Sequence, residues 1–139
     1  MAEVLRMAVF KNKKKGVEIP YPVYKPSHNV KFGKFDPKKQ YPYDDLIRKA
    51  ALSQGLDPEE FRKQIHQESK QDPNAVSKAN CIGLGQIHVA TAVGYYGLPK
   101  ERTDALFDPE FNLMFAAKIM KDSLVSCRGD YNCPLAMYN

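Results

Sequence analysis

The sequence has few cysteines and few histidines, with only three of each among its 139 residues. Cys81, Cys127 and Cys133 are too few and too scattered for a disulfide scaffold. We favour three free thiols, and the alternative is a bridge between Cys127 and Cys133 across the turn at Gly129. No cysteine and histidine pair has the spacing of a zinc site. The sequence therefore indicates neither a metal ion nor a cofactor.

Long apolar runs are also absent. No stretch approaches the roughly 18 consecutive apolar residues that a transmembrane helix needs. Residues 1–15 contain no apolar run that ends in a small-residue cleavage site. We therefore expect neither a membrane span nor a signal peptide.

Positive charge is concentrated at the N-terminus. Residues 1–40 hold 10 Lys and Arg against 3 Asp and Glu, whereas residues 41–139 hold 11 against 13. A basic segment suits contact with an anionic surface, and nucleic acid, an anionic cell wall, anionic lipid and an acidic protein all qualify. A solvated tail is the equally weighted alternative, and the lysines at 13–15 are better interpreted as a solvated cluster than as a nucleic-acid site.

Proline content separates an arm, residues 1–42, from a domain, residues 43–139. The prolines of the arm are Pro20, Pro22, Pro26, Pro37 and Pro42. They interrupt any helical period, so we expect an extended basic arm, whose aromatic residues could lie along the domain or across a protein partner. The chain has enough apolar residues for one modest core, which predicts a single domain.

Capping signals predict that this domain is mainly helical. Apolar residues at helical spacing predict a first helix from Tyr43 or Asp44 to just before Gly55. Residues 57–60 read Asp-Pro-Glu-Glu, with an N-cap Asp and Pro at the first helical position, and predict a second helix to about Ser69.

The same cap-plus-proline signature recurs at residues 108–110 and predicts the longest helix, which ends before Gly129. A short helix near residues 91–96 and a last helix from Pro134 complete the expected fold. No strand is predicted.

Five short motifs follow one another in the domain. They are Glu68-Ser69, Pro-Asn-Ala-Val-Ser at 73–77, Gly-Leu-Gly-Gln at 83–86, Phe-Asp-Pro at 107–109 and Ala-Met-Tyr-Asn at 136–139. In this order, across residues 44–139, they resemble the catalytic domain of the soluble lytic transglycosylases, which has the goose-type lysozyme fold. Gly85 stands where the family has methionine. The arm lies outside the resemblance.

Glu68 is the candidate catalytic residue, because it ends the second predicted helix directly before a loop. In an apolar cleft, desolvation raises the pKa of a carboxyl group and keeps it protonated near neutral pH, as a general acid requires. Taken alone, a glutamate there is a solvated charge, and the motifs favour the catalytic interpretation. Asp72 is interpreted as a residue that stabilises the turn before Pro73.

The resemblance implies a peptidoglycan lytic transglycosylase with Glu68 as its single acid and base. Glu68 would protonate the oxygen between N-acetylmuramic acid and N-acetylglucosamine, then take the proton of the muramic C6 hydroxyl as that oxygen attacks C1. The product is a 1,6-anhydro sugar, whereas most glycosidases use two carboxyl groups and water. The residues implied to bind the glycan strand are Ser77, Gln86, Tyr138 and Asn139. Their alternatives are a turn hydroxyl for Ser77, a surface amide for Gln86 and a core aromatic for Tyr138.

Two other functions stay open. One is a hydrolytic goose-type lysozyme, and the other is a structural component of a virion or secretion apparatus, docked through the arm. Without a signal peptide, a wall-cleaving enzyme needs another route, so we expect a phage virion-associated protein that acts in the periplasm or cell wall of its bacterial host. The family continues beyond its Tyr-Asn motif, so the end at Asn139 predicts a fragment of a longer protein or a helix supplied from elsewhere.

Overall fold

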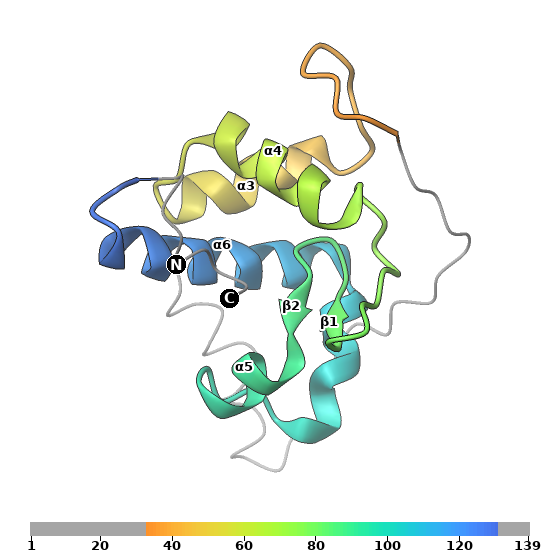
Figure 1. The fold of residues 1–139 in the computed structure, drawn as a ribbon, viewed down its shortest axis with the longest axis vertical. Coiled ribbons are helices and arrows are strands. Elements are labelled where there is room, and N and C mark those ends of the chain that lie inside the picture. Colours follow the sequence, from red (N-terminus) through yellow and green to blue (C-terminus); the bar gives the residue numbers. More distant parts are fainter. Residues whose placement is uncertain (1–32, 131–139) are drawn as a thin grey trace.

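The computed structural model describes residues 33–130. Residues 1–32 and 131–139 are the grey trace in Figure 1, and the last predicted helix, from Pro134, lies outside the described residues. Within 33–130 the chain is mainly helical, with two short strands. The predicted fold class, a mainly α domain, is confirmed.

Helices α3 (Asp44–Ser53), α4 (Pro58–Ser69) and α6 (Pro109–Ser126) form the main layer of the described structure. α3 packs against both of the others, and α6 runs beneath α3 and α4 in Figure 1. Side chains such as Phe61, Ile65 and Phe115 fill the core with 2% exposure or less. These three helices begin within a residue of the predicted starts.

Both predicted aspartate caps are present. Asp57 accepts hydrogen bonds from the backbone N–H groups of Glu59 and Glu60, and Asp108 accepts one from Phe111 at 2.9 Å. In each helix proline follows the cap, where its missing N–H costs no intrahelical bond. The caps therefore fix where α4 and α6 begin.

The second part contains a hairpin, β1 (Cys81–Ile82) and β2 (Ile87–His88), followed by α5 (Val89–Gly94) and the 3₁₀ helix η2 (Lys100–Phe107). The expectation of no strand is wrong, because two-residue strands are too short to leave an alternating pattern in the sequence. α5 begins and ends two residues before the predicted short helix. The four residues between the strands are the Gly-Leu-Gly-Gln motif.

The described end of the arm, residues 33–42, contacts α4 through Arg62. The guanidinium donates hydrogen bonds to the carbonyl oxygens of Pro37 and Lys39 and to the carboxylate of Asp44. The bond to Asp44 is the main cause that raises the pKa of Arg62. These contacts anchor residues 37–44 on the N-terminal half of the helix that carries Glu68.

Farther along α4, His66 makes a second set of contacts with the same segment. Its Nε2 lies 2.7 Å from the carbonyl oxygen of Gly33, and its ring lies 5.1 Å from the ring of Phe35 and 5.0 Å from that of Tyr41. His66 and Tyr41 are both buried. The division of the chain at residue 42 stays a prediction, but residues 33–42 share contacts with the domain.

The described cysteines differ in oxidation state. Cys81 is a free thiol, whereas Cys127 is bonded in a disulfide. The interpretation with three free thiols is therefore wrong. α6 ends at Ser126, and Gly129 adopts a φ of +85°, a conformation that glycine reaches without steric cost. Cys133, the bonding partner that the sequence suggested, lies outside the described residues. None of the described helices has both the length and the apolar character that a membrane span requires.

Candidate active site

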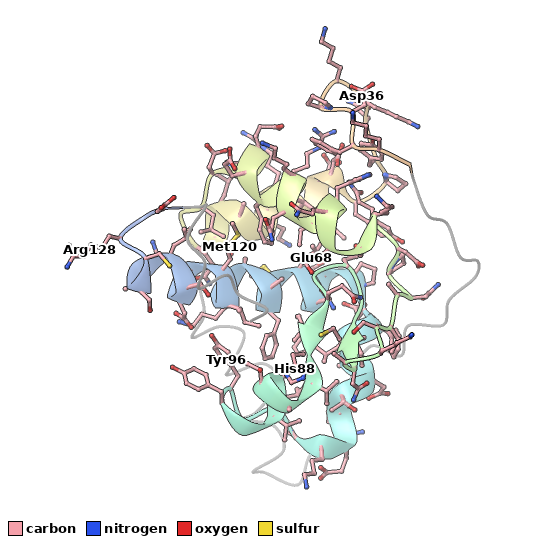
Figure 2. All side chains as sticks on the ribbon, in the orientation of Figure 1. Asp36, Glu68, His88, Tyr96, Met120 and Arg128 are labelled. Carbon is pink, nitrogen blue, oxygen red and sulfur yellow. The ribbon has the colours of Figure 1, made fainter. Side chains whose placement is uncertain are left out.

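Glu68 lies in the last turn of α4, one residue before the end of the helix. Figure 2 shows it where α4, α6 and the β1–β2 turn come together. Its side chain is partly buried. Burial raises the pKa of Glu68 from 4.5 to about 7, while a 3.4 Å hydrogen bond from Gln64 Nε2 acts in the opposite direction. A carboxyl group with this pKa can donate and accept a proton near neutral pH.

Ser69 holds the turn that follows Glu68. Its Oγ donates to the carbonyl oxygen of Ile65 at 3.2 Å and accepts from the N–H of Gln71 at 3.1 Å. Lys70 and Gln71 both have positive φ, 51° and 59°, which costs a non-glycine residue about 1–2 kcal/mol. Sequence reasoning did not assign Ser69 a role, although the Glu-Ser pair is the signal that would have found it.

Gln71 is fully buried, and neither its Oε1 nor its Nε2 has a hydrogen-bond partner. An unsatisfied polar group of this kind costs about 1–3 kcal/mol. Asp72, also buried, accepts a 2.9 Å hydrogen bond from the N–H of Asn74, which confirms its interpretation as a turn residue. The turn after Glu68 therefore contains both backbone strain and an unpaired amide.

The Gly-Leu-Gly-Gln turn depends on Asn112 of α6. This fully buried side chain donates hydrogen bonds to the carbonyl oxygens of Ile82 and Leu106, at 2.8 and 2.7 Å, and accepts one from the N–H of Gly85 at 2.7 Å. Gly83 has a φ of +77°, and a Cβ there would clash with Asn112 Nδ2 and lie 2.6 Å from the Leu106 oxygen. Only glycine fits this position.

Asn112 is a residue that sequence reasoning missed. It lies four residues after the cap Asp108, in a stretch of α6 where Phe111, Leu113 and Phe115 are buried. An amide among buried apolar neighbours is the one signal that the sequence offered, because buried polar groups are almost always hydrogen-bonded. Its partners are 6 to 30 residues away, so the sequence could not identify them.

Gln86 is buried at the end of the turn and has a positive φ of 50°. Its Nε2 donates to the carbonyl oxygens of Ala75 and Gly83, at 3.1 and 3.0 Å, and so ties the 73–77 loop to the turn. Its Oε1 accepts no hydrogen bond from any described residue. Gln86 therefore connects the loop to the turn through its Nε2, while its Oε1 can still accept a hydrogen bond.

Ser77 is exposed, and its Oγ accepts a 3.1 Å hydrogen bond from the N–H of Cys81. It therefore acts as a turn hydroxyl, while its own proton stays available for donation. Tyr138 and Asn139 lie outside the described residues. The described structure thus brings the loop of Ser77 and the turn of Gln86 together, and the assignment of all four as substrate-binding residues stays a prediction.

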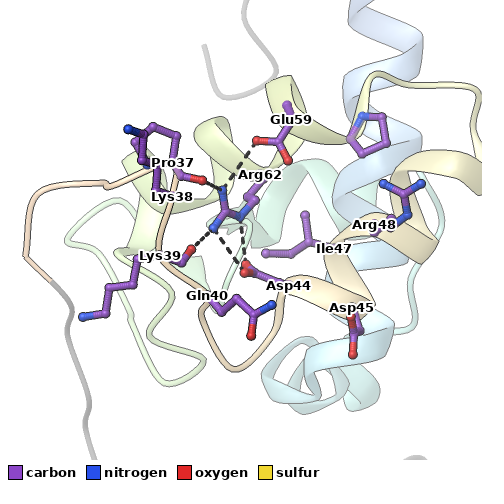
Figure 3. Close-up of a pocket in the computed structure, with 11 residues that line it drawn as sticks. Pro37, Lys38, Lys39, Gln40, Asp44, Asp45, Ile47, Arg48, Glu59 and Arg62 are labelled. Carbon is purple, nitrogen blue, oxygen red and sulfur yellow. Dashed lines mark hydrogen bonds and ion pairs between the residues drawn. The ribbon is translucent and has the colours of Figure 1, made fainter.

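A separate cavity of about 240 Å³ lies between the 37–40 segment and the N-terminal parts of α3 and α4 (Figure 3). Three of the seven charged side chains that line it are paired with one another, since Arg62 contacts both Asp44 and Glu59. We take Glu68, and not this cavity, as the candidate active site, because the carboxyl group with a raised pKa and the sequence motifs occur there. Within residues 33–130, no three His, Cys, Asp or Glu side chains lie together as metal ligands.

One known protein family covers the part of the chain that contains this candidate site. The family described as Transglycosylase SLT domain matches residues 45–139, about two thirds of the chain. The matched range contains Glu68, the strained turn after it, the Gly-Leu-Gly-Gln turn and Asn112. The chain therefore belongs to the transglycosylase SLT domain family, whose activity is directed at peptidoglycan.

Proposed function

We propose that this protein is a peptidoglycan lytic transglycosylase in which Glu68 is the catalytic acid and base. The observation that carries the proposal is the raised pKa of Glu68, about 7, in a half-buried position within the SLT-matched range. A carboxyl group is protonated at the start of such a reaction only if its pKa lies near the working pH. The environment of Glu68 meets this requirement through desolvation.

In the proposed reaction, protonated Glu68 donates its proton to the glycosidic oxygen as the bond from that oxygen to muramic C1 breaks. The resulting carboxylate accepts the proton of the muramic C6 hydroxyl as the C6 oxygen bonds to C1. Glu68 is thereby reprotonated, and the product carries a 1,6-anhydro ring. The substrate supplies the nucleophile, so the reaction consumes no water and needs no second carboxylate.

The environment of Asp72 favours this route over hydrolysis. Most glycosidases that hydrolyse their substrate use a second carboxylate that acts on water or on C1. Asp72 is 2% exposed and one of its oxygens accepts a hydrogen bond from the Asn74 N–H, so it is engaged in the turn. Glu68 is left as the acid and base of the proposed mechanism.

Substrate binding is proposed for Gln86 and Ser77, which retain an acceptor and a donor respectively. A sugar hydroxyl or acetamido group can satisfy both. Tyr138 and Asn139 are proposed to complete the site, on the basis of the family motif. For residues 1–42 we propose docking on an acidic partner within a larger assembly, such as a virion or secretion machine acting at the cell wall. The charge of residues 1–40 supports that role.

The test of the acid and base role is Glu68→Gln, with Glu60→Gln on the same helix as the matched control. The amide is nearly isosteric but cannot transfer the proton, so release of soluble muropeptides from purified cell wall should fall about 10²- to 10⁴-fold. Glu60→Gln should retain activity. Undiminished cleavage by a folded Glu68→Gln protein would remove Glu68 from the mechanism.

A further inference from the structure

Two adjacent tyrosines follow α5 and differ sharply in burial. Tyr95 is 78% exposed, whereas Tyr96 is partly buried. Their ring centroids are 4.9 Å apart at 67°, and Tyr96 packs edge-on against Phe115 of α6 at 5.4 Å. The exposed ring of Tyr95 therefore packs against the ring of Tyr96, which Phe115 holds in place. Because Tyr95 is so exposed, its ring contributes little to the core.

Polar groups from α6 lie beside this aromatic pair. The Tyr96 hydroxyl donates a 2.7 Å hydrogen bond to Asp122, and the Lys118 ammonium donates a 2.9 Å bond to the other oxygen of that carboxylate. Burial is the main cause that raises the pKa of Tyr96, so its hydroxyl stays protonated as a donor. The Lys118 and Asp122 side chains keep 31% and 37% exposure, so a ligand can reach both.

The position of this cluster along α6 relates it to the active site. Asn112 holds the Gly-Leu-Gly-Gln turn, and Asp122 holds Tyr96. These two residues are ten positions apart on one helix, a separation of about 15 Å. In the view of Figure 2, Glu68 is labelled beside α6 near the β1–β2 turn, and Tyr96 lies on the α5 side of α6, nearer the C-terminal end of that helix. An extended chain of several sugars can span such a distance.

We propose that Tyr95, with Tyr96, Lys118 and Asp122 beside it, forms a distal subsite for a sugar ring of the glycan strand. The apolar C–H face of the sugar packs on the exposed ring of Tyr95. The carboxylate of Asp122 accepts from a hydroxyl or acetamido N–H, and Lys118 donates to a sugar or stem-peptide oxygen. This inference rests on the proposed function, because it names where the same substrate binds beyond the cleavage point.

A subsite remote from the reacting bond adds binding that is equal in the ground state and the transition state. Its loss should raise KM and leave kcat unchanged. It should also affect only substrates long enough to reach it. This dependence on strand length separates a distal subsite from a general disturbance of the fold.

The experiment compares Tyr95→Ala, Tyr95→Phe and wild-type full-length protein on long peptidoglycan glycan strands and on a tetrasaccharide from the same strands. Tyr95→Ala should raise KM for long strands about 3- to 10-fold, as expected for the loss of one ring contact. Its kcat and its KM for the tetrasaccharide should not change. Tyr95→Phe should behave like wild type, because the ring is retained.

Leu52→Ala, at an exposed apolar residue of α3, is the control and should leave KM unchanged for both substrates. An equal KM for Tyr95→Ala and wild type on long strands, or an equal increase on both substrates, would overturn the subsite. Strand binding by the Glu68→Gln protein, with and without Tyr95→Ala, separates this failure from failure of the proposed function. That binding measurement needs no catalysis, so a loss of affinity with Tyr95→Ala supports the subsite independently.

Discussion

A buried polar side chain in the N-terminal half of α4 has many partners, whereas one in the segment after the end of α4 has none. Arg62, in the first region, is 8% exposed and has two backbone oxygens, two carboxylates and two aromatic rings as partners. Gln71, in the second region, is fully buried and its side-chain amide has none. Four of the five described non-glycine residues with positive φ also lie within residues 70–86. Backbone strain and a buried amide without hydrogen-bond partners thus occur in the segment that follows Glu68.

This difference indicates that the N-terminal half of α4 stabilises the fold. The segment after α4 instead has a geometry set by the candidate site. Strained backbone of this kind persists only where surrounding structure holds it, and it clusters at functional sites. Here Asn112 and Ser69 hold it: Asn112 donates two hydrogen bonds and accepts one, and Ser69 donates one and accepts one.

The largest effect on stability is expected from Asn112→Ala. The change leaves the N–H of Gly85 and the carbonyl oxygens of Ile82 and Leu106 without their partner, and each buried group so left costs about 1–3 kcal/mol. The free energy of unfolding, measured by urea denaturation, should fall by about 3 kcal/mol or more. Lys121→Ala, at a partly exposed position of the same helix, is the control and should change little. A loss below about 1 kcal/mol for Asn112→Ala would show that this residue does not hold the turn.

The next largest effect on stability is expected from residues 33–42 of the arm, in contrast to residues 1–32. Deletion of residues 1–42 removes the two backbone carbonyl oxygens that Arg62 binds and the rings around His66, and should lower the free energy of unfolding by about 2–4 kcal/mol. Deletion of residues 1–32 keeps those contacts and should cost much less. Thermal unfolding followed by circular dichroism measures both. Equal stability of the two deletion variants would mean that residues 33–42 contribute nothing to the domain.

A pH-dependent effect comes from Glu68. Between pH 4.5 and about 7 the folded protein keeps this carboxyl protonated while the unfolded chain ionises it, so stability falls as pH rises through this window. Each pKa unit corresponds to about 1.4 kcal/mol, which sets an upper bound of about 3 kcal/mol, and partial exposure lowers it. Glu68→Gln lacks the group, so its stability relative to wild type should increase as pH rises through the same window. A difference that is constant with pH would contradict the raised pKa.

The smallest effect is expected from Gln71→Leu. Replacing an unpaired amide with an apolar group of similar size removes the desolvation cost, and should stabilise the protein by about 1–2 kcal/mol. Differential scanning calorimetry would show the gain as a higher Tm. A lower Tm would mean that the Gln71 amide is satisfied in solution, and would weaken the contrast with Arg62.

The sequence predicted the parts of this structure that depend on local signals. The caps at Asp57 and Asp108 gave the starts of α4 and α6, and the motifs singled out Glu68. The partners of Arg62 and Asn112 could not be predicted, because those contacts join residues far apart in the chain. The hairpin escaped prediction for a related reason, since its two-residue strands depend on Asn112 and the turn and not on a periodic pattern of their own.

The central claim is that Glu68 uses the substrate's own C6 hydroxyl as the nucleophile. Mass analysis of the muropeptides released from purified cell wall tests it most directly. We expect products that end in 1,6-anhydro-N-acetylmuramic acid, lighter by one water molecule than the hydrolysed form, and we expect Glu68→Gln to release none of them. Products with free reducing ends would contradict it and identify a hydrolase.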